Sequence, residues 1–189
     1  MNAPIDITGL ILKTNRLTLR SWQQTDLDDL FEYAQVDGVG QMAGWLPHET
    51  IEISKKVLDS FIVGRKTFAI VYAGKVIGSL GIENYPEKDF PEYDALKGRE
   101  LGYVLSKTHW GQGLMPEAVS AVMEYLFQQC HLDFIMISHF AYNHRSRRVI
   151  EKSGLRYIKN VIHRTRYQTE EDAMVYVITK EEFFSATQT

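Results

Sequence analysis

The chain has 189 residues, a formal net charge of −3 and one cysteine. This length is enough to bury a substantial core, and we expect one domain over residues 1–189. A charge so close to neutral excludes a strong global attraction to nucleic acid or to an anionic membrane surface. A lone cysteine excludes an internal disulfide framework, and the sequence indicates neither a signal peptide nor a membrane-spanning apolar run, so we expect a cytoplasmic protein.

The first half of the chain predicts a strand, two helices and a hairpin. Alternating apolar and polar residues predict a strand over 17–22, and Thr25 and Asp28 predict a capping box before a helix over 27–35. A glycine-rich loop over 36–49 leads to a second helix, which is capped near Thr50. Two apolar runs around Ala73 and Gly74 predict a β-hairpin.

The second half predicts strands on both sides of a long helix. An acidic loop over 84–99 precedes a strand over 100–106, and the long helix ends near Cys130. A strand over 134–141, a helix over 145–154 closed by Gly154, two further strands and a terminal turn follow. The order strand, glycine turn, helix, strand predicts a right-handed parallel crossover, so the fold class is α+β.

The glycine turn predicts an anion site. Gly111 and Gly113 stand directly before the long helix, whose first N–H groups lack intrahelical partners and carry partial positive charge. A P-loop is excluded because Leu114 and Met115 stand where it needs Lys and Ser or Thr. The dinucleotide fingerprint is disfavoured because Pro116 replaces its third glycine.

The segments "ELGYVLSKTHWGQGLMPEAV" and "YNHRSRRVIEKSGLRY" resemble the GCN5-related N-acetyltransferases (GNAT), and within them the RimJ/RimL-type ribosomal-protein acetyltransferases. The resemblance covers nearly the whole chain. It implies a mixed central sheet of about seven strands with about four helices, built on a strand–pyrophosphate turn–helix–strand core. The wider superfamily has Arg or Gln where Trp110 stands, and this departure is typical of the branch.

The resemblance implies acetyl-CoA as cosubstrate. The main-chain N–H groups of the glycine turn would face its pyrophosphate, and Asn143 would hydrogen-bond the pantetheine arm. The alternative is that Gly111 and Gly113 only form a tight strand-to-helix turn. The expected cofactor-binding residues are Val104, Leu105, Trp110, Gly111, Gln112, Gly113, Leu114, Met115, Asn143 and Ser146.

Acetyl transfer to an amine needs a neutral attacking nitrogen, so a base is useful. Glu100 matches the position of that base, with a solvated strand-end carboxylate as the alternative. The resemblance places Ser146 near the sulfur, where it can protonate the departing thiolate, whereas capping of the following helix is its structural alternative. Cys130 stands at the C-terminal end of the long helix, where the dipole disfavours a thiolate, so we expect a plain cysteine rather than an acetyl-cysteine intermediate.

The acceptor side is weakly determined by the sequence. In the loop over 40–49, Trp45 corresponds to a wall of a substrate lid, and His139 and Tyr142 are weaker candidates for substrate contact, each with a structural alternative. The six histidines show no ligand spacing, so we expect no metal.

Two charged segments leave alternatives open. Glu87, Asp89, Glu92 and Asp94 would attract cationic amines if their loop lay at the mouth of the site, or they form a solvated surface. Arg164 and Arg166 stand before an acidic run, Glu170, Glu171 and Asp172, and the two groups would pair either in a symmetric homodimer or within a solvated hairpin loop.

The sequence thus predicts an acetyl-CoA-dependent N-acetyltransferase that moves the acetyl group directly to a primary amine in a ternary complex. The acceptor is a small molecule or a peptide or protein N-terminus. The alternative is a non-catalytic CoA-binding sensor or interaction module on the same fold.

Overall fold

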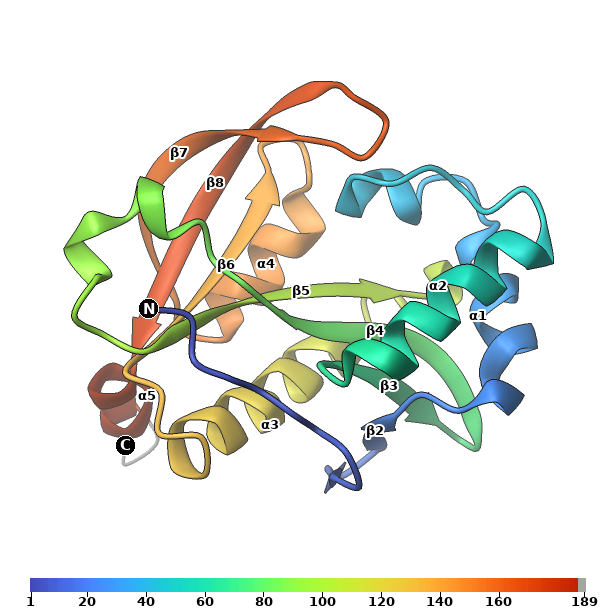
Figure 1. The fold of residues 1–189 in the computed structure, drawn as a ribbon, viewed down its shortest axis with the longest axis horizontal. Helices are drawn as coiled ribbons and strands as arrows, with labels where there is room; N and C mark the ends of the chain where they lie inside the picture. Colours follow the sequence, from blue (N-terminus) through green and yellow to red (C-terminus); the bar gives the residue numbers. More distant parts are fainter. Residues whose placement is uncertain (187–189) are drawn as a thin grey trace.

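The computed structural model describes residues 1–186. In this range the chain forms eight strands and five α-helices (Figure 1). The strands are β1 (Ile11–Lys13), β2 (Leu17–Ser21), β3 (Thr67–Tyr72), β4 (Lys75–Glu83), β5 (Gly98–Leu105), β6 (Phe134–Phe140), β7 (Arg156–Arg164) and β8 (Glu170–Thr179). The helices are α1 (Leu27–Ala34), α2 (Ile51–Gly64), α3 (Leu114–Gln128), α4 (His144–Lys152) and α5 (Lys180–Ala186). None of the helices in residues 1–186 has the length and apolar character needed to cross a membrane.

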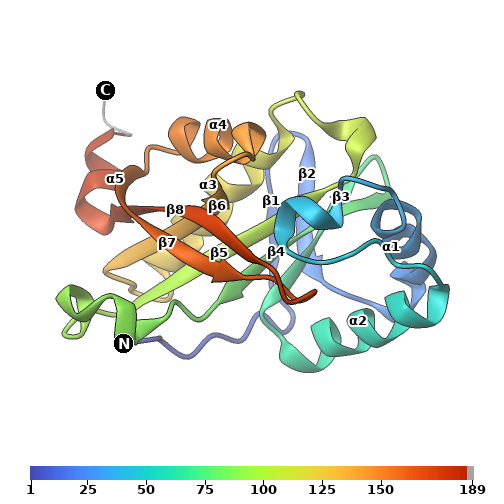
Figure 2. The same cartoon turned by 90° about the horizontal axis from the view of Figure 1, so that it is seen from above.

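All strands join one sheet in the order β1-β2-β3-β4-β5-β6-β8-β7. Every neighbouring pair is antiparallel except β5 and β6, which are parallel and are connected through α3. The predicted α+β class and parallel crossover are therefore confirmed. Helices cover both faces: α1 and α2 pack on the face of β3 that presents Ala69, and α3 packs on the face that presents Phe68 and Ile70 (Figure 2).

The one parallel pair opens into a fork. Hydrogen-bonded register between β5 and β6 runs only from Gly98–Phe134 to Glu100–Met136. Beyond Glu100 the two strands diverge, as Figure 1 shows. The sheet therefore opens beside the residues that precede the glycine turn, and the backbone of this part of β5 has no parallel partner.

A continuous apolar face on α3 fixes the helix under this fork. Its buried side chains recur at helical spacing and belong to the largest core cluster. They are Leu114, Met115, Ala118, Val119, Val122, Met123, Leu126 and Phe127. Truncating one buried leucine of this kind to alanine typically costs about 2–5 kcal/mol, so the start of α3 is held firmly against the sheet.

The start of α1 differs from the sequence prediction. A 3₁₀ turn, η1 (Gln24–Asp26), precedes the helix, and the backbone N–H of Gln23 donates to Asp26 Oδ2 at 2.8 Å. Asp26 is buried and also accepts from Arg20 Nη1 at 2.7 Å. The predicted capping box of Thr25 and Asp28 is therefore wrong, because the half-buried Arg20 guanidinium binds the carboxylate three residues after Gln23.

The other local predictions are confirmed. Thr50 is the N-cap of α2, and the turn between β3 and β4 places Ala73 and Gly74 at φ 49° and 82°. Gly154 follows α4 at φ 81°. The short edge strand β1 was not predicted, because three strand residues carry too little periodicity to be recognised.

Candidate active site

A cleft of about 700 Å³ occupies the fork. It runs from the glycine turn before α3, between β5 and α4, to the floor formed by β3 and β4. The 3₁₀ helix η2 (Gly40–Ala43) and the tip of the β7–β8 hairpin border its far end, where Arg166 N–H donates to Gly44 O at 2.8 Å. The cleft therefore brings together segments that lie far apart in the sequence.

The glycine turn has the backbone of an anion cradle. Gly111 and Gly113 both line the cleft, with φ of 77° and 74°, a region that an L side chain rarely adopts. Gly113 is the N-cap of α3, so the N–H groups of Leu114 and Met115 lie in the first helical turn and lack intrahelical acceptors. Pro116 contributes no N–H, which ends the row of donors.

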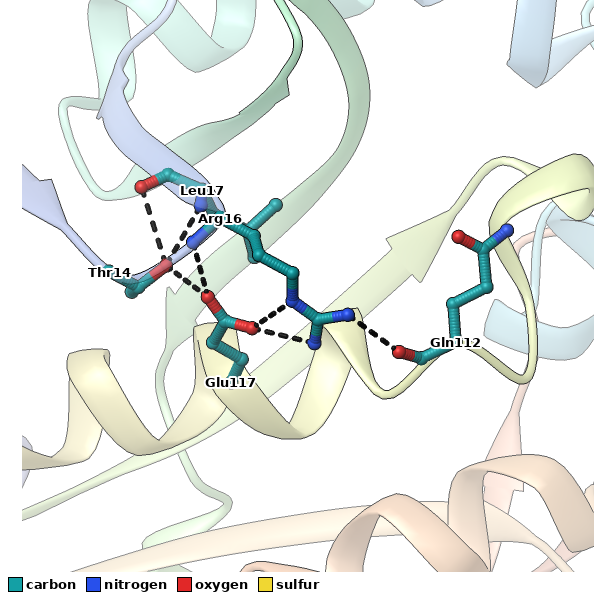
Figure 3. A network of polar contacts seen from close by, with 5 residues as sticks. All are labelled: Thr14, Arg16, Leu17, Gln112 and Glu117. Carbon is teal, nitrogen blue, oxygen red and sulfur yellow. Dashed lines mark hydrogen bonds and ion pairs between the residues drawn. The ribbon is translucent and has the colours of Figure 1, made fainter.

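Arg16 supports this turn from outside the cleft (Figure 3). Its Nη1 donates to Gln112 O at 3.0 Å, and its Nε donates to Glu117 Oε2 at 2.7 Å. Burial alone would raise the pKa of Glu117, but hydrogen bonds from Thr14 and Arg16 hold this pKa below its usual value. We call these contacts of Arg16 with Gln112 and Glu117 the brace. The brace holds Gln112 O outside the cleft and pairs the negative charge of Glu117 with a positive charge. Sequence reasoning missed it because about a hundred residues separate its partners.

A row of cations on α4 faces the same end of the cleft. Arg145, Arg148 and Lys152 all line it, and their spacing of three and four residues places them on one helical face. The Arg145 guanidinium lies 4.8 Å from the centre of the Trp110 ring, and Trp110 Nε1 donates to Leu105 O at 2.8 Å. The i, i+3, i+7 spacing was the sequence signal for these cations, and it was overlooked.

Glu100 lies where β5 and β6 separate. Ser138 Oγ donates to Glu100 Oε1 at 2.6 Å. Burial raises the pKa of Glu100, the Ser138 hydrogen bond opposes this shift, and the charge of Glu83 adds to it. Glu83 stands directly opposite Glu100 on β4, and like charges at such positions destabilise a sheet. Two neighbouring carboxyl groups, one of them with a raised pKa, are typical of functional sites.

The negative charge of the cleft comes from these two carboxylates. Glu83 lines the cleft and forms an ion pair with Lys66. Glu87, Asp89, Glu92 and Asp94 are not among the residues that line the cleft, and the carboxylate of Glu87 accepts hydrogen bonds from Asn2. The steering role considered for the acidic loop is therefore not supported by its position.

Asn143 and Ser146 lie at the start of α4, with a division of roles that the sequence did not predict. Asn143 is the N-cap, since its Oδ1 accepts the Ser146 N–H at 3.1 Å, and its Nδ2 donates to Met42 O at 3.1 Å. The capping alternative for Ser146 is therefore wrong. The Ser146 hydroxyl instead lies 2.9 Å from the hydroxyl of Tyr103, a residue that sequence reasoning did not select.

Two of the three candidates for substrate contact, Trp45 and His139, line the cleft, and Tyr142 does not. Trp45 lines the cleft, as do Val104 and Leu105 on β5. His139 lines it too, but Nδ1 lies 2.8 Å from Phe140 O, Nε2 lies 3.4 Å from the Tyr176 hydroxyl, and burial lowers the pKa of the ring. Tyr142 is 45% exposed and is not a lining residue.

Neither a cysteine nucleophile nor a metal centre is brought to this cleft. Cys130 is a half-buried free thiol beyond the end of α3 and is not a lining residue. Among residues 1–186, no group of three or more His, Cys, Asp or Glu side chains is arranged to hold a metal ion.

Comparison with known proteins identifies the family. Residues 16–156 match the model of the acetyltransferase (GNAT) domain. The chain belongs to the GNAT family. YoaA, an uncharacterized N-acetyltransferase of Bacillus subtilis, is 30% identical over 179 residues, which span 90% of this chain and 97% of that protein.

Solved structures of GNAT proteins share the fold. A GNAT-family acetyltransferase from Bacillus anthracis superimposes with a TM-score of 0.78 at 23% identity, covering 91% of this chain and 99% of that chain. RimL, a ribosomal L7/L12 alpha-N-protein acetyltransferase, gives a TM-score of 0.75 at 18% identity, covering 89% of this chain and 93% of that chain. The eight-stranded mixed sheet of this GNAT protein is thus the family fold, and the protein is an acetyl-CoA-dependent acetyltransferase.

Proposed function

We propose that this GNAT protein acetylates a primary amine by direct transfer from acetyl-CoA in a ternary complex. The observation that carries the proposal is the position of Glu100, a half-buried carboxylate with a raised pKa at the point where β5 and β6 separate. One side of this point leads to the glycine turn and α4, and the other leads to the floor formed by β3 and β4. The cleft therefore has room for a thioester on one side of the carboxylate and an amine on the other.

The cofactor side fits three parts of CoA: the pyrophosphate, the uncharged pantetheine arm and the ribose phosphate. The amides before α3 suit the pyrophosphate, and Gly111 and Gly113 let it approach the backbone closely. The β6-side edge of β5 at Val104 and Leu105 can pair with the amides of the pantetheine arm, since no strand pairs with β5 on that edge. We assign the remaining phosphate, on the ribose, to the α4 row of Arg145, Arg148 and Lys152.

The chemical step uses Glu100 as base, directly or through one water. The neutral amine nitrogen forms a bond to the acetyl carbon, Glu100 accepts the proton that this nitrogen loses, and the carbon–sulfur bond breaks with its electron pair on sulfur. A raised pKa brings the carboxyl closer to the pH at which an amine reacts and so improves proton transfer. Ser146 donates a hydrogen bond to the developing thiolate. Asn143 can offer its second amide hydrogen to the pantetheine arm.

The acceptor is a cationic amine. Glu83 and Glu100 place two carboxylates in the cleft, and Lys66 forms an ion pair with Glu83. An ammonium group that approaches this pair gains electrostatic attraction before it is deprotonated. Trp45 provides an apolar wall across from them. Small amines and peptide or protein N-termini both satisfy these conditions.

We further propose that residues 1–189 act as one catalytic domain of the RimJ/RimL type, since RimL is among its structural neighbours. The homodimer stays a prediction. In the β7–β8 hairpin Arg164 stands opposite Glu170 in the same chain, so these opposite charges face each other without a second subunit. A non-catalytic CoA sensor is disfavoured because the desolvated carboxylate of Glu100 destabilises the fold, and CoA binding alone does not need it.

A panel of amines with acetyl-CoA tests the proposal, with thiol release and product mass as readouts. We expect polyamines and peptides with a free N-terminus to react faster than acidic amino acids, and an acetylated amine to appear in proportion to thiol. Thiol release that does not depend on any amine in the panel would contradict the proposal.

A further inference from the structure

Tyr103 reaches across the fork from β5 to α4. Its hydroxyl lies 2.9 Å from the Ser146 hydroxyl, and both residues line the cleft. Because side chains alternate along a strand, Tyr103 points to the face of β5 opposite Glu100. The two sides of β5 thus present a carboxylate to the acceptor side and a phenol to the residue proposed to meet the sulfur.

The Tyr103 hydroxyl has one hydrogen and two neighbouring acceptors on Ser146. The side-chain oxygen is at 2.9 Å and the main-chain carbonyl oxygen is at 3.3 Å. That carbonyl lies within α4, where the N–H of the residue four positions later also donates to it. The contact to Ser146 Oγ is the shorter of the two, and either hydroxyl of that pair can be its donor.

We propose that Tyr103 is a positioning residue for acetyl transfer, because its hydroxyl donates to Ser146 Oγ and leaves the Ser146 hydrogen free to point at the thioester sulfur. This inference rests on the proposed function. Without Tyr103, the Ser146 hydroxyl can turn toward any acceptor near the start of α4. With Tyr103 as donor, the Ser146 hydrogen is free to turn into the cleft, which Ser146 lines.

Tyr103 transfers no proton in this scheme. The electron pair of the breaking carbon–sulfur bond goes to sulfur, the amine proton goes to Glu100, and the Ser146 hydroxyl stabilises the thiolate through a hydrogen bond. Burial raises the pKa of Tyr103, so the phenol stays protonated throughout the reaction and remains a donor. Its contribution is the orientation of Ser146.

A double-mutant cycle of Tyr103→Phe and Ser146→Ala tests the inference. We expect Tyr103→Phe to lower kcat by about tenfold with an unchanged KM for the amine and an unchanged Kd for CoA, because only an interaction of the transition state is lost. In the Ser146→Ala background, Tyr103→Phe should cause no further loss, since it acts through Ser146. Tyr72→Phe is the control, because Tyr72 packs against the same core but does not line the cleft.

The acetyl selenoester of CoA gives a second readout that a structural role would not move. A selenolate leaves with less help than a thiolate, so the Tyr103→Phe loss should shrink with this substrate, whereas a misfolded variant would lose both activities equally. Full kcat in Tyr103→Phe, or losses that multiply in the double variant, would overturn the inference and leave the acetyltransferase function standing. A wild-type protein that releases no thiol with any amine would overturn the proposed function itself.

Discussion

Arg16 and Glu117 are joined by two contacts of 2.7 Å, from Nε and Nη2 of the guanidinium to the same carboxylate oxygen. The remaining guanidinium nitrogen, Nη1, holds the carbonyl of Gln112 inside the pyrophosphate turn. One side chain from the start of β2 thus fixes the turn and neutralises the acid in the first turn of α3. This brace explains how a cradle of two glycines keeps one conformation.

Replacing Arg16 with methionine should weaken CoA binding. The turn loses a hydrogen bond and the phosphates meet an uncompensated Glu117, so we expect Kd for CoA to rise by about tenfold, equivalent to about 1.4 kcal/mol. Isothermal titration calorimetry measures this change. Lys13→Met, a nearby loss of positive charge outside the brace, is the control and should leave Kd unchanged. Equal Kd values for Arg16→Met and the parent would show that the brace does not support the cradle.

The cations of α4 that line the cleft, Arg145, Arg148 and Lys152, should bind the ribose phosphate of CoA. We expect the double variant Arg148→Gln, Lys152→Gln to lower kcat/KM for acetyl-CoA by about tenfold or more and to leave kcat/KM for acetyl-dephospho-CoA nearly unchanged, because the lost charges contact only that phosphate. The control Arg147→Gln removes a cation of the same helix that is paired with Glu151 and does not line the cleft. If the variant loses activity with both substrates to the same degree, the row has another role.

The order of strands and helices could be predicted because each element carries a local signal. The alternation over β2, the glycines at 111 and 113 and the spacing of apolar residues in α3 all depend on neighbours within a few residues. The α1 cap failed for the opposite reason. Arg20 is the half-buried partner that decides the role of the buried Asp26, and burial is not visible in the sequence.

Site residues could be predicted where a local sequence motif identifies them, but their interaction partners could not. Glu100 and Ser146 follow from their positions in motifs. Their partners Ser138 and Tyr103 belong to other elements and lie dozens of residues away along the chain. The two alternatives for the acidic loop could not be separated from the sequence, since sequence proximity to the Glu100 strand does not place its charges in the cleft. Pairing across the sheet put Glu83 there instead.

Gly102 should control the width of the acceptor path. A Cβ added there would meet no atom within 4 Å, and its φ lies outside the left-handed region, so Gly102→Ala is expected to fold at least as stably as the parent. Since Gly102 lines the cleft, the added methyl should raise KM for bulky amines several-fold. Steady-state kinetics measures this effect, with Gly64→Ala on α2 as the control. Identical KM values for slim and bulky amines in parent and variant would contradict this assignment.

Glu100 should lower the stability of the fold at neutral pH. Its pKa is raised in the folded protein, so the folded state binds more protons than the unfolded state between the ordinary value of about 4.3 and the raised one. The stabilising effect of the protonated group is present below about pH 4 and is lost as pH rises through the folded pKa. Glu100→Gln should therefore raise Tm at pH 7 to 8, and the gain should vanish toward pH 4. A Tm difference that is constant with pH would show that the carboxyl does not titrate differently on folding.

The pH dependence of kcat/KM for acetyl transfer to a cationic amine, compared between the parent and Glu100→Gln, tests the central claim most directly. The account predicts that the parent profile rises through the raised pKa of Glu100 and that the variant loses activity by about 10²-fold or more at and just above this pKa, where the parent carboxylate is ionised and can accept the proton. CoA binding should be unchanged, because Glu100 lies away from the phosphate sites. A variant with the parent's rate and the parent's pH profile would remove Glu100 from the mechanism and contradict the account.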